Sequence, residues 1–376
     1  MSAAGPRQGA KAPLGGSAAH AVASVGAHDL TVPGDEFASR VVRWQKVHGR
    51  NSLPWQNTRD PYLVWLSEIM LQQTQVAAVR EYFARFVARC PDVRTLAAAT
   101  EDEVLALWSG LGYYSRARNL HRCAQEIVAV HGGEFPRSAE SLQTLPGIGR
   151  STAAAIASFC FGERVAILDG NVKRVLTRVL GFGDDLAVAA NERALWSHAT
   201  ELLPRHAVQE AMPRYTQGLM DLGATVCAVR NPQCLICPAS ELCTARREGA
   251  PQRYPVKTRK LKRSAQSLWL LQARAAQGEV WLERRPVPGV WAGLYCLPVF
   301  EDRAALEALV PAKYRARLQD APAFTHVLTH KDLHLHPVAL PMPVSQSIKG
   351  EGAWFTPEQW PQLGLPAPIR KLLSVP

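Results

Sequence analysis

Four cysteines are gathered within the segment CAVRNPQCLICPASELC, at Cys227, Cys234, Cys237 and Cys243. The N-terminal segment shows no apolar core of signal-peptide length, so we expect these thiols in a reducing cytosol. Clustered thiols in such a compartment are more typical of a metal site than of disulfides. Spacing alone leaves two candidates open: a zinc knuckle, although only Cys234 and Cys237 form a close pair, or an iron–sulfur cluster.

Two acidic residues lie in apolar surroundings and could act as an acid and its partner. Glu68 stands in VWLSEIMLQQTQV on a predicted helix, where desolvation raises the pKa of a carboxyl group. Asp169 follows the apolar run VAIL and could also be the N-cap of a helix over NVKRVL. One protonated and one ionised carboxyl group is the arrangement that cleaves glycosidic bonds. A structural Glu68 paired with an arginine is the alternative.

A glycine-rich turn precedes Asp169 in LQTLPGIGRSTAAAIASFCFG, with Pro146, Gly147 and Gly149 between two predicted helices. Glycines let the backbone approach a ligand closely, and the helix that begins near Arg150 presents free amides. Such a hairpin suits a DNA phosphate without reading the base. A plain turn between two helices is the alternative.

The positions of these groups depend on two kinds of domain. With 376 residues, 47% of them hydrophobic, the chain can form two or three domains, and its net charge of +11 favours a polyanionic partner. Helical spacing dominates up to residue 245, and short strands dominate after the basic run ARREGAPQRYPVKTRKLKR. We therefore predict four segments: a disordered tail over 1–35, an all-α core over 36–245, an exposed basic linker over 246–264 and a smaller α+β domain over 265–376.

The hairpin, Asp169 and the cysteine loop together resemble the helix-hairpin-helix DNA glycosylase superfamily. In the iron–sulfur branch of that superfamily the cysteine loop holds a [4Fe-4S] cluster, so the resemblance implies this cofactor on the four cysteines and makes zinc a remote alternative. Endonuclease III-like glycosylase/lyases of the same branch carry a nucleophilic lysine where this chain has Ser151. A monofunctional glycosylase is therefore the preferred interpretation.

Adenine DNA glycosylases of the MutY type are similar over residues 36–376, in motifs that include LPW, LWSGLGYYSRARNL and MDLGATVC. The resemblance implies excision of adenine mispaired with 8-oxoguanine or guanine, after the base has been flipped out of duplex DNA. It implies that Glu68 protonates the adenine, that Asp169 stabilises the sugar cation and that Asn171 helps to arrange the site. An adenine pocket is implied at Trp55, Leu71, Ser151 and Gln217. DNA contacts are implied at Gln73, Thr74 and Tyr113. Apart from the resemblance, we expect phosphate contacts at Gly147 and Gly149 of the hairpin and at Lys173, for which a solvated helix face is the alternative.

The segment LERRPVPGVWAGLYCLP resembles a Nudix fold, but the acid-rich helix that binds metal in Nudix hydrolases does not follow it. The domain should therefore not hydrolyse nucleotides. The resemblance to the MutY family implies that it recognises the oxidised guanine instead. Leu328, Thr329 and His330 match the Phe-Ser-His recognition loop of that family, with the hydroxyl kept and the aromatic ring lost. Four histidines in THVLTHKDLHLHP are expected on strands and not on a metal.

Other functions stay open at this stage. The chain could be a mismatch glycosylase for another base, an endonuclease III-like glycosylase/lyase, or a lesion-binding protein without turnover. A ferredoxin-like carrier fits the cysteines but leaves both acids unexplained. We expect a monomer in the bacterial cytoplasm, bound to nucleoid DNA and not to a membrane, since no apolar stretch approaches 18 residues.

Overall fold

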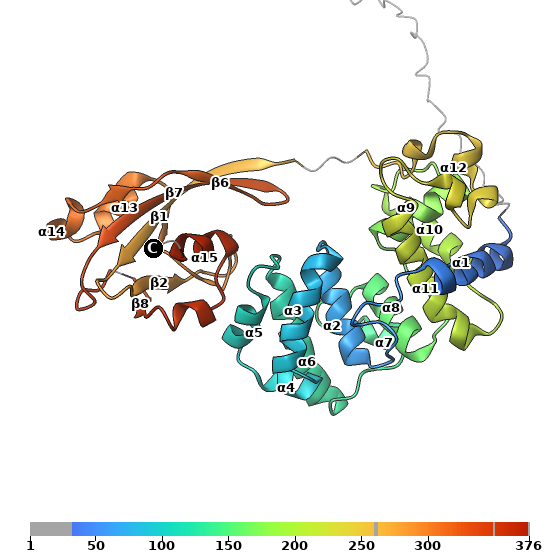
Figure 1. The fold of residues 1–376 in the computed structure, drawn as a ribbon, viewed down its shortest axis with the longest axis horizontal. Helices are drawn as coiled ribbons and strands as arrows, with labels where there is room; N and C mark the ends of the chain where they lie inside the picture. Colours follow the sequence, from blue (N-terminus) through green and yellow to red (C-terminus); the bar gives the residue numbers. More distant parts are fainter. Residues whose placement is uncertain (1–31, 259–261, 349, 375–376) are drawn as a thin grey trace, which may run out of the picture. The chain divides into compact units, whose positions relative to one another are not determined.

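The computed structural model describes residues 32–258, 262–348 and 350–374, so most of the predicted N-terminal tail lies outside it. The first part is helical and the second contains a mixed sheet, which confirms the predicted fold class (Figure 1). The helices of the first part are α1 Gly34–His48, α2 Pro61–Leu71, α3 Val76–Arg89, α4 Val93–Ala98, α5 Glu101–Trp108, α6 Ser115–His131, α7 Ala139–Leu142, α8 Arg150–Phe161, α9 Gly170–Leu180, α10 Ala189–Glu201, α11 Val208–Thr225 and α12 Thr244–Arg247. None of the described helices is long and apolar enough to cross a membrane.

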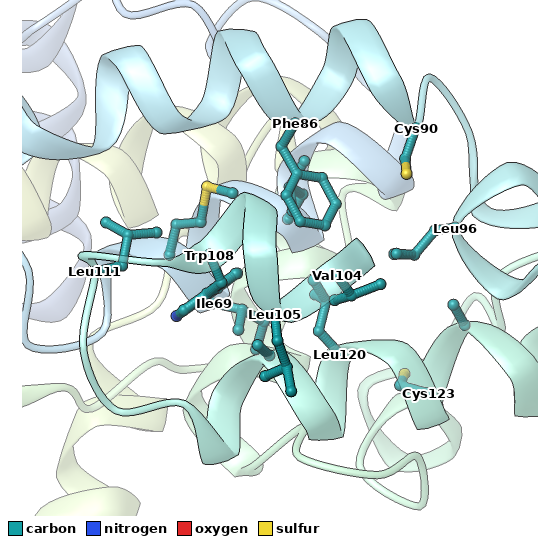
Figure 2. Packing of buried hydrophobic residues seen from close by; sticks show 14 of the residues in the cluster. Ile69, Phe86, Cys90, Leu96, Val104, Leu105, Trp108, Leu111, Leu120 and Cys123 are labelled. Atoms are coloured by element: carbon teal, nitrogen blue, oxygen red, sulfur yellow. The ribbon is translucent and has the colours of Figure 1, made fainter. Parts of the chain in front are cut away.

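Helices α2 to α8 pack around one apolar core (Figure 2). Trp65, Phe86 and Trp108 are fully buried there, and burying a side chain of this size stabilises a fold by about 1.5–3 kcal/mol. Helix α5 begins with a capping box, in which the side chains of Thr100 and Glu103 each accept a hydrogen bond from the other's backbone amide. The core therefore fixes α2, the helix that carries Glu68, from several sides.

Helices α1, α9, α10, α11 and α12 form the second group, in which α11 packs against α1 and α9 (Figure 1). Helix α8 contacts both α2 and α11, and so joins the two groups. Helix α9 starts at its N-cap Asp169 and ends at Gly181, whose φ of 68° is a left-handed conformation that suits glycine. The two acids thus come from different helix groups.

The second part of the chain is one sheet with three flanking helices (Figure 1). Its path runs β3-β2-β1-β7-β5, with β1 and β7 parallel over their whole length and the other pairs antiparallel. Its strands and helices are β1 Ser264–Arg274, β2 Val280–Arg284, β3 Tyr295–Cys296, β4 Val299–Phe300, α13 Arg303–Leu309, α14 Ala312–Arg315, β5 Gln319–Asp320, β6 Phe324–Val327, β7 Lys331–Pro341, β8 Gly352–Phe355 and α15 Ala367–Leu373.

The basic segment after the cysteines differs from the exposed linker predicted over residues 246–264. Its first part packs on the helical core, because the buried Arg178 guanidinium donates to the carbonyls of Pro251 and Tyr254. Tyr254 is itself only 6% exposed, and the Leu186 amide donates to the carbonyl of Val256. Charge density along the sequence could not reveal this packing, since the partners come from α9 and the turn that follows it.

Candidate active site

A cavity of about 1370 Å³ opens between the two helix groups. It is lined from α2, the turn after α2, the start of α8, the start of α9 and one face of α11. The cavity brings together all the predicted catalytic and adenine-pocket residues and two of the predicted DNA contacts: Trp55, Glu68, Leu71, Gln73, Thr74, Ser151, Asp169, Asn171 and Gln217. The predicted residues Tyr113, Gly147, Gly149 and Lys173 do not line it.

Glu68 lies in the last turn of α2, between the buried residues Ser67 and Ile69. Desolvation by the cavity wall raises the pKa of Glu68 to about 7, and the negative charge of Asp169 adds to this effect. The helix dipole acts in the same direction, because the negative end of α2 lies beside this carboxyl group. Glu68 can therefore carry a proton at neutral pH, as a general acid must.

Asp169 is the N-cap of α9 and also lines the cavity. Its Oδ1 accepts a hydrogen bond of 2.7 Å from the Val172 amide. Burial raises the pKa of Asp169 above its ordinary value, while the amides of Val172 and Asn171 and the positive charge of Arg174 act against that rise. The start of the helix thus favours an ionised carboxylate in this half-buried place.

Ser151 and Trp55 form part of the surroundings of the two acids. The Ser151 hydroxyl accepts a 3.1 Å hydrogen bond from the amide of Leu168, the residue before Asp169. Ser151 therefore ties the start of α8 to the segment that carries the acid. Trp55 is 6% exposed and packs edge-on against Phe83, with 5.3 Å between ring centres, which gives the cavity a rigid aromatic wall.

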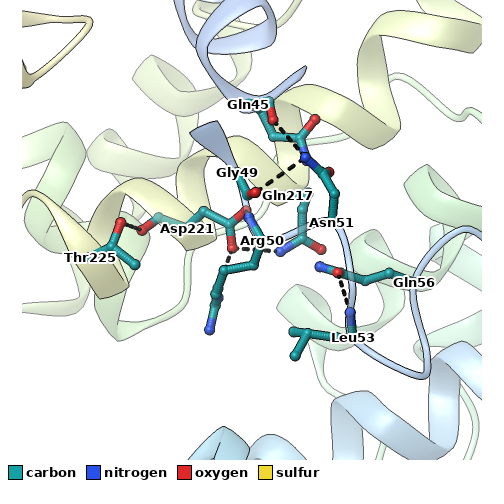
Figure 3. Close-up of polar contacts among 9 residues, drawn as sticks. All are labelled: Gln45, Gly49, Arg50, Asn51, Leu53, Gln56, Gln217, Asp221 and Thr225. Atoms are coloured by element: carbon teal, nitrogen blue, oxygen red, sulfur yellow. Dashed lines mark hydrogen bonds and ion pairs between the residues drawn. The ribbon is translucent and has the colours of Figure 1, made fainter. Parts of the chain in front are cut away.

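A buried acid that the sequence analysis missed organises the opposite wall (Figure 3). Asp221 is fully buried and accepts three hydrogen bonds: 2.8 Å from Gln217 Nε2, 2.9 Å from the Arg50 amide and 2.6 Å from Arg50 Nε. The bond from Nε2 to Asp221 fixes the orientation of the Gln217 amide, and Gln217 lines the cavity. Asp221 stands four residues after Gln217 in the apolar context of MDLGATVC, and that spacing on one helix face was the available signal.

Arg174 connects Asn171 to the cysteine loop. Its Nη2 donates to Asn171 Oδ1 at 2.8 Å and to the carbonyl of Gly223 at 2.6 Å. Its Nε donates to the carbonyl of Cys227 at 2.8 Å. The orientation of the Asn171 side chain therefore depends on the same arginine that holds the first residue of the cysteine loop.

The four cysteines line a second, smaller cavity whose walls are largely apolar. Burial, followed by the negative charge of the other three cysteines, raises the pKa of the Cys237 thiol to about 12. Arg178 donates from Nη1 to Cys227 Sγ at 3.4 Å. Among the described residues, no histidine or carboxylate lines this cavity, so the donor set there is purely sulfur and fits an iron–sulfur group. Within the described residues, no three His, Cys, Asp or Glu side chains are grouped closely enough to bind a single metal ion.

The predicted DNA-contact residues outside the main cavity have distinct settings. Gly147 has a φ of 75°, and a Cβ there would lie 2.6 Å from the Cβ of Asn119, whereas a Cβ on Gly149 would meet nothing within 4 Å. The backbone at Gly149 is therefore open to a ligand. Lys173 forms an ion pair with Glu192.

The predicted recognition loop forms the tip of the hairpin between β6 and β7. The amide of Leu328 donates to the carbonyl of Lys331 at 2.8 Å, which closes the turn. Thr329 and His330 are exposed, while Leu328 packs partly against apolar neighbours. The tip of the hairpin is therefore a turn closed by a backbone hydrogen bond.

Comparisons with known proteins agree with this architecture. Residues 66–199 match the HhH-GPD superfamily base excision DNA repair protein family, and residues 269–375 match the NUDIX domain family. The adenine DNA glycosylase of Buchnera aphidicola from Acyrthosiphon pisum is 36% identical over 345 residues, which cover 90% of this chain and 97% of that relative. The mouse adenine DNA glycosylase is 45% identical over 219 residues, covering 56% of this chain and 41% of the mouse protein. The structure of a thermostable thymine-DNA glycosylase is 28% identical with a TM-score of 0.50, over 57% of this chain and 97% of that one.

Proposed function

We propose, because this chain belongs to the adenine DNA glycosylase family, that it removes adenine mispaired with 8-oxoguanine or guanine from duplex DNA. It works as a monomer on nucleoid DNA in the bacterial cytoplasm and leaves the strand uncut. The observation that carries the proposal is the pair of acids, Glu68 and Asp169, in one cavity with Ser151 beside them in place of an amine nucleophile.

The reaction divides between the two acids. Protonated Glu68 donates its proton to a ring nitrogen of the flipped adenine, so the base leaves as a neutral molecule when the bond to the sugar breaks. Ionised Asp169 stabilises the positive charge that develops on the sugar, and Asn171 helps to arrange the site. The Glu68 carboxylate then accepts a proton from the water that adds to the sugar.

The adenine pocket is formed by Trp55, Leu71, Ser151 and Gln217. The aromatic wall of Trp55 offers a stacking surface for the flipped base. The Gln217 amide, held by Asp221, offers an acceptor to an exocyclic amine, which adenine has and thymine lacks. This polar group supports adenine as the excised base.

The remaining assigned residues handle the duplex. Gln73, Thr74 and Tyr113 wedge the strands and contact the opposite base, while the backbone at Gly147 and Gly149 receives a phosphate. Lys173 contacts a phosphate only if the phosphate replaces Glu192 as its ion-pair partner. We assign the glycosylase core to residues 36–245 and recognition of the oxidised guanine to residues 265–376, through Leu328, Thr329 and His330.

Cys227, Cys234, Cys237 and Cys243 would hold a [4Fe-4S] cluster in the second cavity. The all-sulfur donor set of that cavity and the family to which the chain belongs support this assignment. When bound, it supplies four metal–thiolate bonds that fix the loop over residues 227–243. The excision steps need only the side chains of the first cavity.

A mismatch glycosylase for another base is the second candidate. It is favoured by the likeness to the thymine-DNA glycosylase structure, because a protein with a similar helical fold is named for the removal of a different base. An endonuclease III-like lyase has less support, because Ser151 cannot form a Schiff base.

The test is single-turnover cleavage of duplexes with adenine opposite 8-oxoguanine, guanine or thymine, and with thymine opposite guanine. Each is measured with and without alkali. We expect breaks at adenine only after alkali, and only in the first two duplexes. Breaks at thymine would support the second candidate, and breaks without alkali would revive the lyase.

A further inference from the structure

Two turns that are distant in the sequence hold their tips in a left-handed backbone conformation. Gln73, between α2 and α3, has a φ of 57°, and Tyr113, between α5 and α6, has a φ of 47°. Neither residue is a glycine, and such a conformation costs about 1–3 kcal/mol. Both side chains are exposed, Tyr113 by 40%. Surrounding contacts must therefore hold the two tips in place.

One buried arginine on α6 reaches the first of these turns. Arg116 is 8% exposed, and its guanidinium donates to four oxygens around the end of α2. These are the carbonyls of Ile69 at 2.9 Å, Met70 at 2.9 Å and Gln72 at 2.6 Å, and the Thr74 hydroxyl at 3.2 Å. The arginine thus caps the helix that carries Glu68 and brackets Gln73 from both sides.

The same guanidinium also reaches the second turn. Its Nη2 donates to the carbonyls of Leu111 and Gly112, each at 3.2 Å. Its central carbon lies 5.4 Å from the ring centre of Tyr113 and 5.2 Å from that of Trp108. Trp108 and Leu111 both belong to the buried core around α5 (Figure 2). The second turn is therefore fixed by the same side chain as the first.

The charge of Arg116 is balanced by carbonyl dipoles and aromatic faces. Among the described residues no carboxylate forms an ion pair with it, and burial lowers the pKa of Arg116 to about 10. Only a planar guanidinium with several N–H donors can hydrogen-bond to both turns at once. A lysine has one donor centre and cannot.

We propose that Arg116 is a positioning residue for base extrusion, which locks the two turns together so that Gln73 and Tyr113 enter the duplex as one rigid wedge. The inference rests on the proposed function, which assigns both tips to the duplex. It predicts that Arg116 acts on extrusion through these tips and not only on the stability of the core.

The test compares Arg116→Lys with Arg122→Lys. Arg122 is an exposed arginine on the same helix, and within the described part of the chain its guanidinium donates to Asn119 alone. Single-turnover excision of adenine opposite 8-oxoguanine is measured together with the fluorescence of a 2-aminopurine placed next to that adenine. We expect Arg116→Lys to slow both signals by about 10²-fold, as a small misplacement of a positioning group can. DNA affinity should change much less, and Arg122→Lys should match the wild type.

A double-mutant cycle with Tyr113→Ala separates positioning from general damage. If Arg116 works through the wedge, adding Arg116→Lys to the Tyr113→Ala variant should slow excision by less than about threefold. An equal cost in both backgrounds, or a wild-type rate for Arg116→Lys, would overturn the inference. Circular dichroism sets a temperature at which all variants are folded. If the wild type increases the 2-aminopurine fluorescence without excising adenine, the proposed function is overturned. The fluorescence comparison of Arg116→Lys with the wild type would still test the role of Arg116 in extrusion.

Discussion

The two acids of the cavity sit at opposite ends of their helices. Glu68 occupies the last turn of α2, at the negative end of the helix dipole, and accepts no hydrogen bond from the described residues. Asp169 occupies the N-cap of α9, at the positive end, and accepts a hydrogen bond from the Val172 amide. Burial raises the pKa of both groups, but only Asp169 has amides and nearby positive charges that oppose the rise.

The comparison teaches how two similar groups acquire different protonation states. The apolar wall of α2 and the negative charge of Asp169 favour a protonated Glu68. The start of α9 favours an ionised Asp169. A proton donor and a carboxylate therefore coexist near neutral pH because the two helices present opposite ends to one cavity.

The largest expected effect comes from removing the proton of Glu68. Glu68→Gln keeps the shape of the side chain but cannot transfer a proton, so we expect single-turnover excision to fall by about 10²–10⁴-fold. Glu210→Gln is the matched control, because Glu210 lines the same cavity and is exposed. Equal rates for the two variants would contradict the assignment of Glu68.

Asp169→Asn tests the other acid, with a smaller expected loss. Asparagine caps a helix about as well as aspartate, so α9 should stay in place while the negative charge disappears. We expect excision to slow by about 10²–10³-fold, the usual cost of one lost electrostatic group. Asp92→Asn removes the charge from the N-cap of α4, away from the cavity, and should leave the rate unchanged. A wild-type rate for Asp169→Asn would show that the charge is not needed.

The comparison also makes a prediction about stability. The pKa of Glu68 is about 7 in the folded protein and about 4.3 in an unfolded chain, so the folded state binds more protons between these values. Folding stability is therefore lost as the pH rises through this window. Glu68→Gln should be more stable than the wild type by about 1–3 kcal/mol at pH 8 and nearly equal at pH 4. Urea unfolding at the two pH values measures this, and no difference at pH 8 would argue against a raised pKa.

The smallest effect is expected at the wall opposite the acids. Asp221→Asn weakens the bonds that orient Gln217 and leaves Arg50 without its counter-charge, so we expect about a tenfold slower excision. Thr225→Val is the control, since among the described residues the Thr225 hydroxyl bonds to the backbone carbonyl of Asp221 and not to its carboxylate. The loss should appear in the rate for adenine at saturating enzyme. A loss of the same size in Thr225→Val would point to general damage of α11.

The sequence predicted the local surroundings of single residues where neighbouring residues were sufficient. The apolar flanks of Glu68 and the cap position of Asp169 follow from such neighbours, and the structure has both residues in these settings. The likeness to a known family extended this to Gln217 and Trp55, which line the same cavity.

Features that depend on distant contacts were missed. Asp221 and Arg50 are 171 positions apart, so nothing local marks them as partners. The fold of the basic segment depends on Arg178, which lies about seventy positions before it. Left-handed backbone at Gln73 and Tyr113 contradicts the usual preference of these residue types and is held by the hydrogen bonds of Arg116.

The pH dependence of single-turnover excision, measured on adenine opposite 8-oxoguanine, tests the opposed protonation states most directly. If Glu68 must be protonated, the rate should fall tenfold per unit as the pH rises above about 7. At the acidic end it should fall again as Asp169 takes up a proton. A rate that stays level or increases through pH 7 would contradict Glu68 as the acid.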